Sequence, residues 1–210
     1  MDKPLTDKRT RKQTTHERIV ETASRAIRRG GFQGVGVADI MKEAGLTHGG
    51  FYAHFSSRDA LLAEALVHRR EGAGDDAVLD AGSDGPFGIE RRIARAQAAG
   101  ASALRALVEA YLSDRHLVAI ETGCPVAALA SEMPRQAPEV RAAAARRVRG
   151  LIALVERALP FGSPADSAVA IASQLVGALQ LARALGDNDE GRAVLAASRR
   201  ALSVQEPDDR

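Results

Sequence analysis

The side chains best suited to bind another molecule lie between residues 47 and 58. They combine hydroxyl, imidazole, phenol and guanidinium groups with two glycines: Thr47, His48, Gly49, Gly50, Tyr52, His54 and Arg58. Hydroxyl and imidazole groups at the start of this run can reach base edges, and glycines permit close backbone approach. Phenol, imidazole and guanidinium groups suit phosphate oxygens. Zinc binding by His48 and His54 is not expected, because they fall on different helix faces and no carboxylate cluster accompanies them.

Four helices are predicted to position these residues. Apolar residues at i, i+1, i+4, i+7 and i+8 predict an amphipathic helix from Thr15 to Arg29, capped by Thr14 or Thr15 and ended by Gly30-Gly31. Shorter helices are expected at residues 37–44 and 48–55, followed by a fourth helix with Leu61, Leu62, Ala65 and Leu66 on its inner face. Thr47 is expected to cap the helix at 48–55, and Ser56 or Ser57 the fourth. A turn at Gly45 separates the first two short helices, which is the outline of a helix-turn-helix unit. Phe51 and Phe55 are expected to anchor the short helix at 48–55 in the core.

Composition favours an all-helical protein with a basic N-terminal end. The chain of 210 residues is 45% hydrophobic but only 3% aromatic, and it is rich in alanine. Residues 1–60 carry 11 Lys and Arg against 7 Asp and Glu, a net +4, whereas residues 61–210 carry 18 against 20, a net −2. This asymmetry indicates a polyanionic partner for one end or a solvated basic tail. With one cysteine, no signal peptide and no apolar run approaching about 20 residues, a cytoplasmic location without membrane contact is expected.

The remainder of the chain predicts a helical body. Helical patterns occur at roughly 89–98, 101–113, 124–133, 137–159, 164–185 and 189–203, and residues 72–88 form a connecting loop. The helices at 137–159 and 164–185 have wide apolar arcs, which favour a two-fold four-helix bundle between two copies of the chain. The residues expected at this interface are Leu151, Val155, Leu175, Gly177 and Leu179. Ordinary packing within one chain is the alternative.

Three runs resemble the DNA-binding signature of the tetracycline-repressor (TetR/AcrR) family: Ala44-Gly45-Leu46-Thr47, Tyr52-Ala53-His54-Phe55 and Ser57-Arg58-Asp59-Ala60-Leu61. The resemblance implies an all-α protein with a flexible basic tail at residues 1–14, a three-helix helix-turn-helix domain at 15–65 and a helical ligand-binding and dimerisation domain at 66–205. One departure is Val35-Gly36-Val37, where the family commonly has a Ser or Thr that caps the second helix.

The resemblance also implies a function. A member of this family is expected to be a homodimeric repressor, released from double-stranded operator DNA by a small-molecule effector, with the motion passing through the helix near Leu61 to Val67. No cofactor and no metal are expected. Enzyme activity is disfavoured, because the sequence has no Gly-rich phosphate loop, no Gly-x-Ser-x-Gly elbow and no paired-histidine metal motif.

The sequence contains no motif that identifies the effector. Polar or soft residues in apolar surroundings are the candidates for lining its pocket: Tyr111, His116, Cys124, Met133, Phe161 and Gln174. Two alternatives remain open at this point. Cys124, at the expected start of a helix, can act as a thiol sensor of oxidants or electrophiles or as a small apolar core residue. The chain can also be a helical binding module without DNA affinity.

Overall fold

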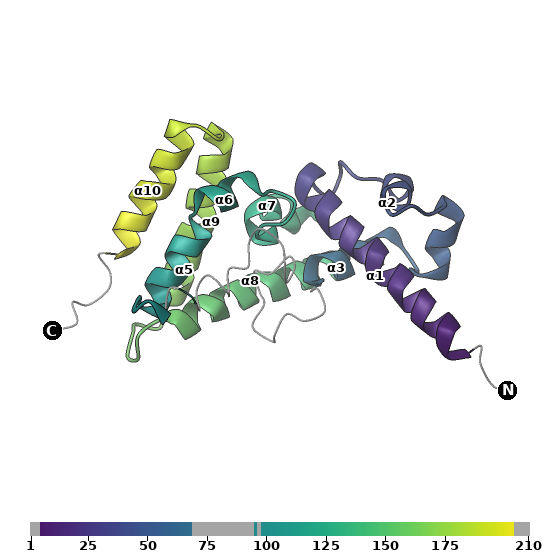
Figure 1. The fold of residues 1–210 in the computed structure, drawn as a ribbon, viewed down its shortest axis with the longest axis horizontal. Helices are drawn as coiled ribbons and strands as arrows, with labels where there is room; N and C mark the ends of the chain where they lie inside the picture. Colours follow the sequence, from purple (N-terminus) through teal and green to yellow (C-terminus); the bar gives the residue numbers. More distant parts are fainter. Residues whose placement is uncertain (1–4, 69–94, 96–97, 204–210) are drawn as a thin grey trace. The chain divides into compact units, whose positions relative to one another are not determined.

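The computed structural model describes residues 5–68, 95 and 98–203, and every regular element in those ranges is a helix (Figure 1). This confirms the all-α prediction. The chain divides into two compact units. The first comprises Met1–His68 together with Leu129–Ala145, and the second comprises Arg69–Ala128 together with Arg146–Arg210.

Helix α1, Leu5–Gly30, is the longest element of the first unit. It buries the predicted apolar stripe: Ile19, Val20, Ala23, Ala26 and Ile27. The predicted start at Thr15 is wrong, since the helix continues back through residues expected to form a flexible tail. No Gly or Pro interrupts the sequence between Leu5 and Arg29, so nothing stops the helix there. The Thr15 hydroxyl accordingly donates to the Arg11 carbonyl, at 2.8 Å, inside the helix rather than capping it.

Three short helices follow α1: α2, Val37–Glu43; η1, His48–Ala53; and α3, Arg58–Val67. Gly31 follows the end of α1 with φ +75°, and Gly45 follows α2 with φ +70°. Residues other than glycine rarely adopt this left-handed conformation. Of the two serines predicted as caps, Ser57 caps α3, its hydroxyl accepting from the Ala60 amide at 3.0 Å. Both α2 and α3 pack against α1.

The element at His48–Ala53 differs from its prediction. It is a 3₁₀ helix rather than the α-helix expected over 48–55, and Thr47 makes no side-chain capping bond. Consecutive glycines at 49 and 50 explain the difference, because each disfavours an α-helix by about 1 kcal/mol relative to Ala. The tighter 3₁₀ turn is the form that such short segments commonly take.

A second stretch of chain completes the first unit. The predicted helix at 124–133 is split into α7, Pro125–Leu129, most of which belongs to the second unit, and a 3₁₀ turn η2, Met133–Arg135, which belongs to the first. Helix α8, Pro138–Ala158, follows, and its first turns belong to the first unit. Leu129–Ala145, far along the sequence, therefore takes part in the unit that contains α1, α2, η1 and α3.

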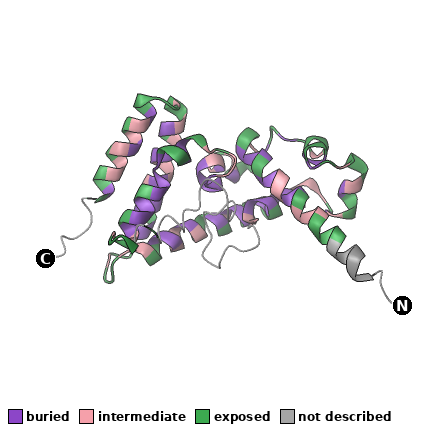
Figure 2. Ribbon diagram, in the orientation of Figure 1, coloured by how far each residue is buried: buried purple, intermediate pink, exposed green. Residues whose placement is uncertain are grey.

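The second unit is built on α5, Ala103–Tyr111; α6, Asp114–Val118; α9, Ser167–Leu185; and α10, Asp189–Ser203. Helices α9 and α10 lie side by side (Figure 1), α6 packs on α9, and α5 on α10. Helix α5 is buried along most of its length (Figure 2). Helix α6 was not predicted; it begins after Ser113, whose hydroxyl accepts from the His116 amide at 3.3 Å. The predicted loop at 72–88 and most of the predicted helix at 89–98 lie outside the described residues.

Helix α9 is unusually apolar. The helix has 19 residues, and an 18-residue window within it has a mean hydropathy of 1.5. By length and composition alone it could therefore cross a bilayer, and the expectation that no run approaches this length was wrong. The core helix of a soluble protein meets the same criterion, and α9 packs against α6 and α10. Only 39% of its apolar window is buried within one chain, which leaves an apolar face uncovered.

The uncovered face is not the predicted one. Leu151, Val155, Leu175 and Leu179, expected at a dimer interface, are at most 2% exposed and form the core of a single chain. The apolar side chains that the second unit exposes on α8 and α9 are Val148, Val169, Leu181 and Leu185. Gly177, half-buried on α9, has open space where a Cβ would lie. Apolar periodicity located the two helices correctly, but the residues that it assigned to the interface are buried within one chain.

Candidate nucleic-acid interface

The η1 segment presents a polar edge held by a hydrophobic anchor. Thr47, His48 and Gly49 are exposed, and Gly50 is half-buried. Phe51, only 1% exposed, stacks on Phe55 with ring centroids 5.5 Å apart, so the core prediction for both rings is confirmed. The anchor fixes a segment too short to be stable alone. The groups predicted to reach base edges therefore lie on the surface.

Tyr52 projects from the same segment. Its side chain is 71% exposed, and its ring meets Phe51 edge-on, with centroids 5.1 Å apart and an interplanar angle of 80°. The contact orients the ring without burying it. A phenol held in this way can offer its hydroxyl to a phosphate oxygen.

His54 lies in a cluster of rings beside α1. Its ring centroid is 6.0 Å from that of His16, which stacks on Phe55 at 4.5 Å and pairs with Glu64, Nε2 to Oε1, at 2.5 Å. The His54 Nδ1 is buried and has no hydrogen-bond partner. Burial lowers the pKa of His54, and the nearby His16 and Lys12 lower it further. Its imidazole is therefore neutral near pH 7, able to donate one hydrogen bond but carrying no charge toward DNA.

Arg58 has a second task that the sequence did not indicate. Its Nη2 donates to the carbonyls of Phe32 and Val35, the latter at 3.2 Å. Both carbonyls belong to the turn between α1 and α2. Arg58 thus holds this turn from the N-terminus of α3, whereas the sequence predicted a phosphate contact.

Glu132 holds the same turn from another side. Its Oε2 accepts from the Phe32 amide at 2.9 Å, across 100 residues of sequence. Sequence reasoning missed this residue, since nothing local to Glu132 indicates a partner so distant. Its contact is visible only in the folded unit.

The start of α2 confirms the departure noted in the sequence. Gly36 occupies the N-cap position with φ −86° and ψ 155°, and no side chain caps the helix. A Cβ at Gly36 would approach the Asp39 Oδ2 to 3.0 Å, so a larger residue there would have to shift Asp39. The first amides of α2 are thus without the hydroxyl that the family commonly supplies.

Three of the six candidate effector residues come together in the second unit. Tyr111, His116 and Cys124 are each at most 1% exposed, and the rings of Tyr111 and His116 meet edge-on with centroids 4.8 Å apart. The His116 Nδ1 lies 2.7 Å from the Tyr111 carbonyl, and its Nε2 accepts from the Cys124 amide at 3.0 Å. Burial, first of all, raises the pKa of Tyr111 well above its ordinary value, and Cys124 raises it further.

This cluster is closely packed. A Cβ at Gly123 would lie 2.6 Å from the Ala119 carbonyl oxygen and 2.8 Å from the His116 ring. The closed packing and the buried thiol support the interpretation of Cys124 as a core residue.

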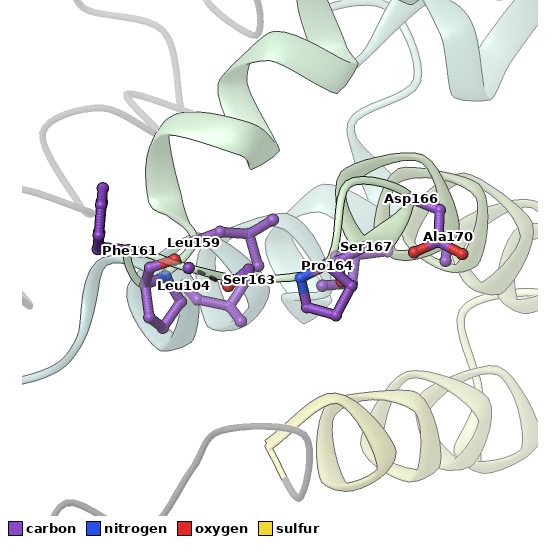
Figure 3. A pocket seen from close by; sticks show the side chains of 11 residues that line it. Leu104, Leu159, Phe161, Ser163, Pro164, Asp166, Ser167 and Ala170 are labelled. Atoms are coloured by element: carbon purple, nitrogen blue, oxygen red, sulfur yellow. Dashed lines mark hydrogen bonds between the residues drawn. The ribbon is translucent and has the colours of Figure 1, made fainter.

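The other three candidates are dispersed. Met133 is buried in the first unit, Gln174 is half-buried on α9, and Phe161 is fully exposed in the loop between α8 and α9. Phe161 alone of the six lines the 440 Å³ pocket of the second unit, where its ring stands away from the other lining side chains (Figure 3). The pocket lies between the start of α5, the α8–α9 loop and the start of α9, with Leu104 and Ile171 as apolar walls and Asp166 at one end.

The N-terminal helices and their exposed polar segment define a helix-turn-helix DNA-binding protein. Residues 19–65 match the family described as bacterial regulatory proteins, tetR family, and residues 100–198 match the tetracyclin repressor-like C-terminal domain. The chain belongs to the tetR family of DNA-binding transcriptional regulators.

Relatives agree with this assignment. An uncharacterized HTH-type transcriptional regulator of Mycobacterium tuberculosis, Rv0196, is 29% identical over 186 residues, covering 83% of this chain and 87% of that protein. The uncharacterized HTH-type regulator YerO of Bacillus subtilis is 41% identical over 52 residues, 25% of this chain and 18% of YerO.

Solved structures share the fold. A TetR-family regulator from Agrobacterium tumefaciens superimposes with a TM-score of 0.62 at 22% identity, covering 92% of this chain and 98% of that one. The reduced form of NemR from E. coli gives 0.61 at 19% identity, with 89% and 96% covered.

Proposed function

We propose that this regulator is a homodimeric repressor that acts in the cytoplasm and leaves its operator when a small molecule binds. The observation that carries the DNA-binding role is the exposed edge of η1, where Thr47, His48 and Tyr52 stand on a base held by Phe51. Thr47 and His48 contact base edges, and Tyr52 contacts a phosphate. His54 and the Gly49-Gly50 backbone lie close enough in sequence to share this contact.

Dimerisation is supported by the uncovered face of α9. Val169, Leu181 and Leu185 are 45–63% exposed on a helix of high hydropathy. A second copy of the same face would cover them, and Gly177 allows two helices to approach closely. The two recognition segments would then address half-sites about 34–36 Å apart, one turn of DNA.

An effector of modest size is supported by the pocket between α5 and α9. Its 440 Å³ lies within the range of about 300–1,000 Å³ typical of ligand sites. Leu104, Leu159 and Ile171 favour an apolar ligand body, while Ser163 and Asp166 offer polar contacts. Thiol sensing is the second candidate effector mechanism, but the buried Cys124 gives it no support.

The test of DNA binding begins with selection of duplexes from a random-sequence pool by the wild-type protein. Tyr52→Phe, which removes only the hydroxyl, should weaken binding to every duplex alike by about three- to tenfold. Thr47→Ala should instead change which duplexes are preferred. Ser203→Ala, which removes an exposed hydroxyl at the end of α10 in the second unit, is the matched control and should change neither.

Two results would overturn the proposal. One is a wild-type protein that enriches no duplex or binds DNA without dependence on salt, since phosphate contacts impose a salt slope. The other is a Leu181→Glu variant that remains as dimeric as the wild type in sedimentation, which would remove the α9 face from the interface.

A further inference from the structure

Side chains stabilise the turn between α1 and α2 by hydrogen bonds to both a backbone amide and backbone carbonyls. The Phe32 amide donates to the Glu132 Oε2 at 2.9 Å, and the carbonyls of Phe32 and Val35 accept from Arg58. Phe32 itself is fully buried. A buried amide that lacks a hydrogen-bond partner destabilises the fold. The hydrogen bond to the Glu132 carboxylate therefore stabilises this turn.

The carboxylate of Glu132 fits against the turn without spare room. Gly31 has φ +75°, and a Cβ there would lie 2.5 Å from the Glu132 Oε1. Only glycine can both adopt this conformation and leave space for the carboxylate. The turn and Glu132 are therefore matched in shape as well as in hydrogen bonding.

Glu132 is in turn fixed by its own segment. Its amide donates to the Leu129 carbonyl at 2.9 Å, and its carbonyl accepts from the Gln136 side chain and the Arg135 amide, both at 3.1 Å. The neighbouring Met133 is buried. The carboxylate consequently projects from a rigid base.

The turn matters because it leads directly into the first residues of α2. Gly36 provides no side-chain cap, so the path of residues 31–36 sets where α2 begins. Helix α2 packs against η1, where a Cβ at Gly50 would lie 3.7 Å from the Met41 Cε. A displacement of the turn would thus move the segment that carries Thr47 and Tyr52.

We propose that Glu132 is a positioning residue for DNA binding: through the Phe32 amide, its carboxylate sets the placement of α2 and η1. It lies more than sixty residues beyond the helix-turn-helix sequence, and its proposed role is exerted through the Phe32 amide. The proposal rests on the proposed DNA-binding function. It connects sequence-specific affinity to a segment, Leu129–Ala145, that directly continues the chain of the second unit.

The sign of the effect separates positioning from electrostatics. Removing a negative charge from a DNA-binding unit should strengthen binding if charge alone mattered. If Glu132 positions α2, Glu132→Ala should instead weaken binding to the selected duplex about tenfold, with no weakening on an unrelated duplex. Glu139→Ala, which removes the same charge from an exposed site at the start of α8 in the same unit, is the matched control and should weaken neither.

The conservative variant supplies the rescue. Glu132→Gln retains a carbonyl oxygen that can accept from Phe32, and it should bind the selected duplex within about threefold of wild type. Amide hydrogen exchange at Phe32, which needs no DNA, should be faster in Glu132→Ala and close to wild type in Glu132→Gln. If Glu132→Ala does not fold, Glu132→Met has similar length without an acceptor and takes its place in both measurements.

Selected-duplex affinity in Glu132→Ala or Glu132→Met that equals that of Glu139→Ala would overturn this proposal alone, as would unchanged exchange at Phe32. A wild-type protein that enriches no duplex would overturn the proposed function, and this proposal with it.

Discussion

Each of the two units stabilises an irregular turn by side-chain hydrogen bonds to its backbone, but the side chains that accept from the backbone amide differ. In the first, Arg58 donates to turn carbonyls while the Glu132 carboxylate accepts from the Phe32 amide. In the second, Arg183 donates to the carbonyls of His116, Leu117 and Ala119, at 2.8–3.3 Å, while the His116 ring accepts from the Cys124 amide. Each turn thus has one arginine for its carbonyls and one acceptor for an amide.

The difference lies in charge and in water. His116 is fully buried, and because its Nε2 accepts a hydrogen bond while its Nδ1 lies 2.7 Å from a carbonyl, it is the neutral tautomer with the proton on Nδ1. Glu132 and Arg58 are charged and only half-buried. Water can reach the outer parts of the Glu132 and Arg58 side chains but not the His116 ring. A substitution at the first turn should therefore lower stability less than a substitution of His116.

The largest expected effect comes from His116. His116→Ala leaves the Cys124 amide and the Tyr111 carbonyl without their ring partner and opens a cavity, which should lower the free energy of unfolding by about 3–5 kcal/mol. Urea denaturation measures this, with the exposed His48→Ala as control, for which a change below about 0.5 kcal/mol is expected. A loss under about 1 kcal/mol for His116→Ala would show that water reaches this turn too, and the contrast between the units would disappear.

A smaller effect is expected from Arg58→Met. If Arg58 holds the turn, the variant should lose about 1–2 kcal/mol of stability, while the slope of log affinity against log salt stays unchanged. Lys42→Met, at an exposed lysine on α2, provides the comparison of equal charge and should not alter stability. A slope reduced by about one for Arg58→Met, with stability intact, would restore the phosphate contact predicted from the sequence.

The smallest effect concerns acid. Burial lowers the pKa of both His54 and His68; His16 and Lys12 add to this for His54, whereas Glu21 opposes it for His68. The unfolded state therefore binds more protons than the folded state as pH falls through the ordinary histidine pKa of about 6.5, and stability should decline from pH 8 to pH 5.5. Urea denaturation of the double variant His54→Gln/His68→Gln should show a shallower decline. An equal decline would assign the pH dependence to other groups.

Local features of the first unit could be read from the sequence because their causes are local. The turn at Gly45, the cap at Ser57 and the anchors Phe51 and Phe55 each follow from a residue type and its near neighbours. The weakness of the 48–55 helix was visible in its glycines, although the change to a 3₁₀ helix was not.

Features that depend on distant partners could not be read in this way. Glu132 and Phe32 are 100 residues apart, and Arg58 reaches carbonyls 26 and 23 residues before it. Likewise, apolar periodicity shows that a helix such as α9 has apolar faces to bury. In the sequence, however, a face buried within one chain looks the same as a face left for a second chain. Apolar periodicity therefore could not distinguish Leu175, buried within one chain, from Leu181, left exposed.

The open surface at Gly49 has a consequence for how operator preference can diverge among related regulators. Gly49 has no positive φ, and nothing lies within 4 Å of the place where its Cβ would be. A side chain can therefore be added at the centre of the recognition segment without disturbing the Phe51 anchor beneath it. Under the proposed DNA-binding role of η1, single substitutions there can supply new base contacts without a steric clash in the fold.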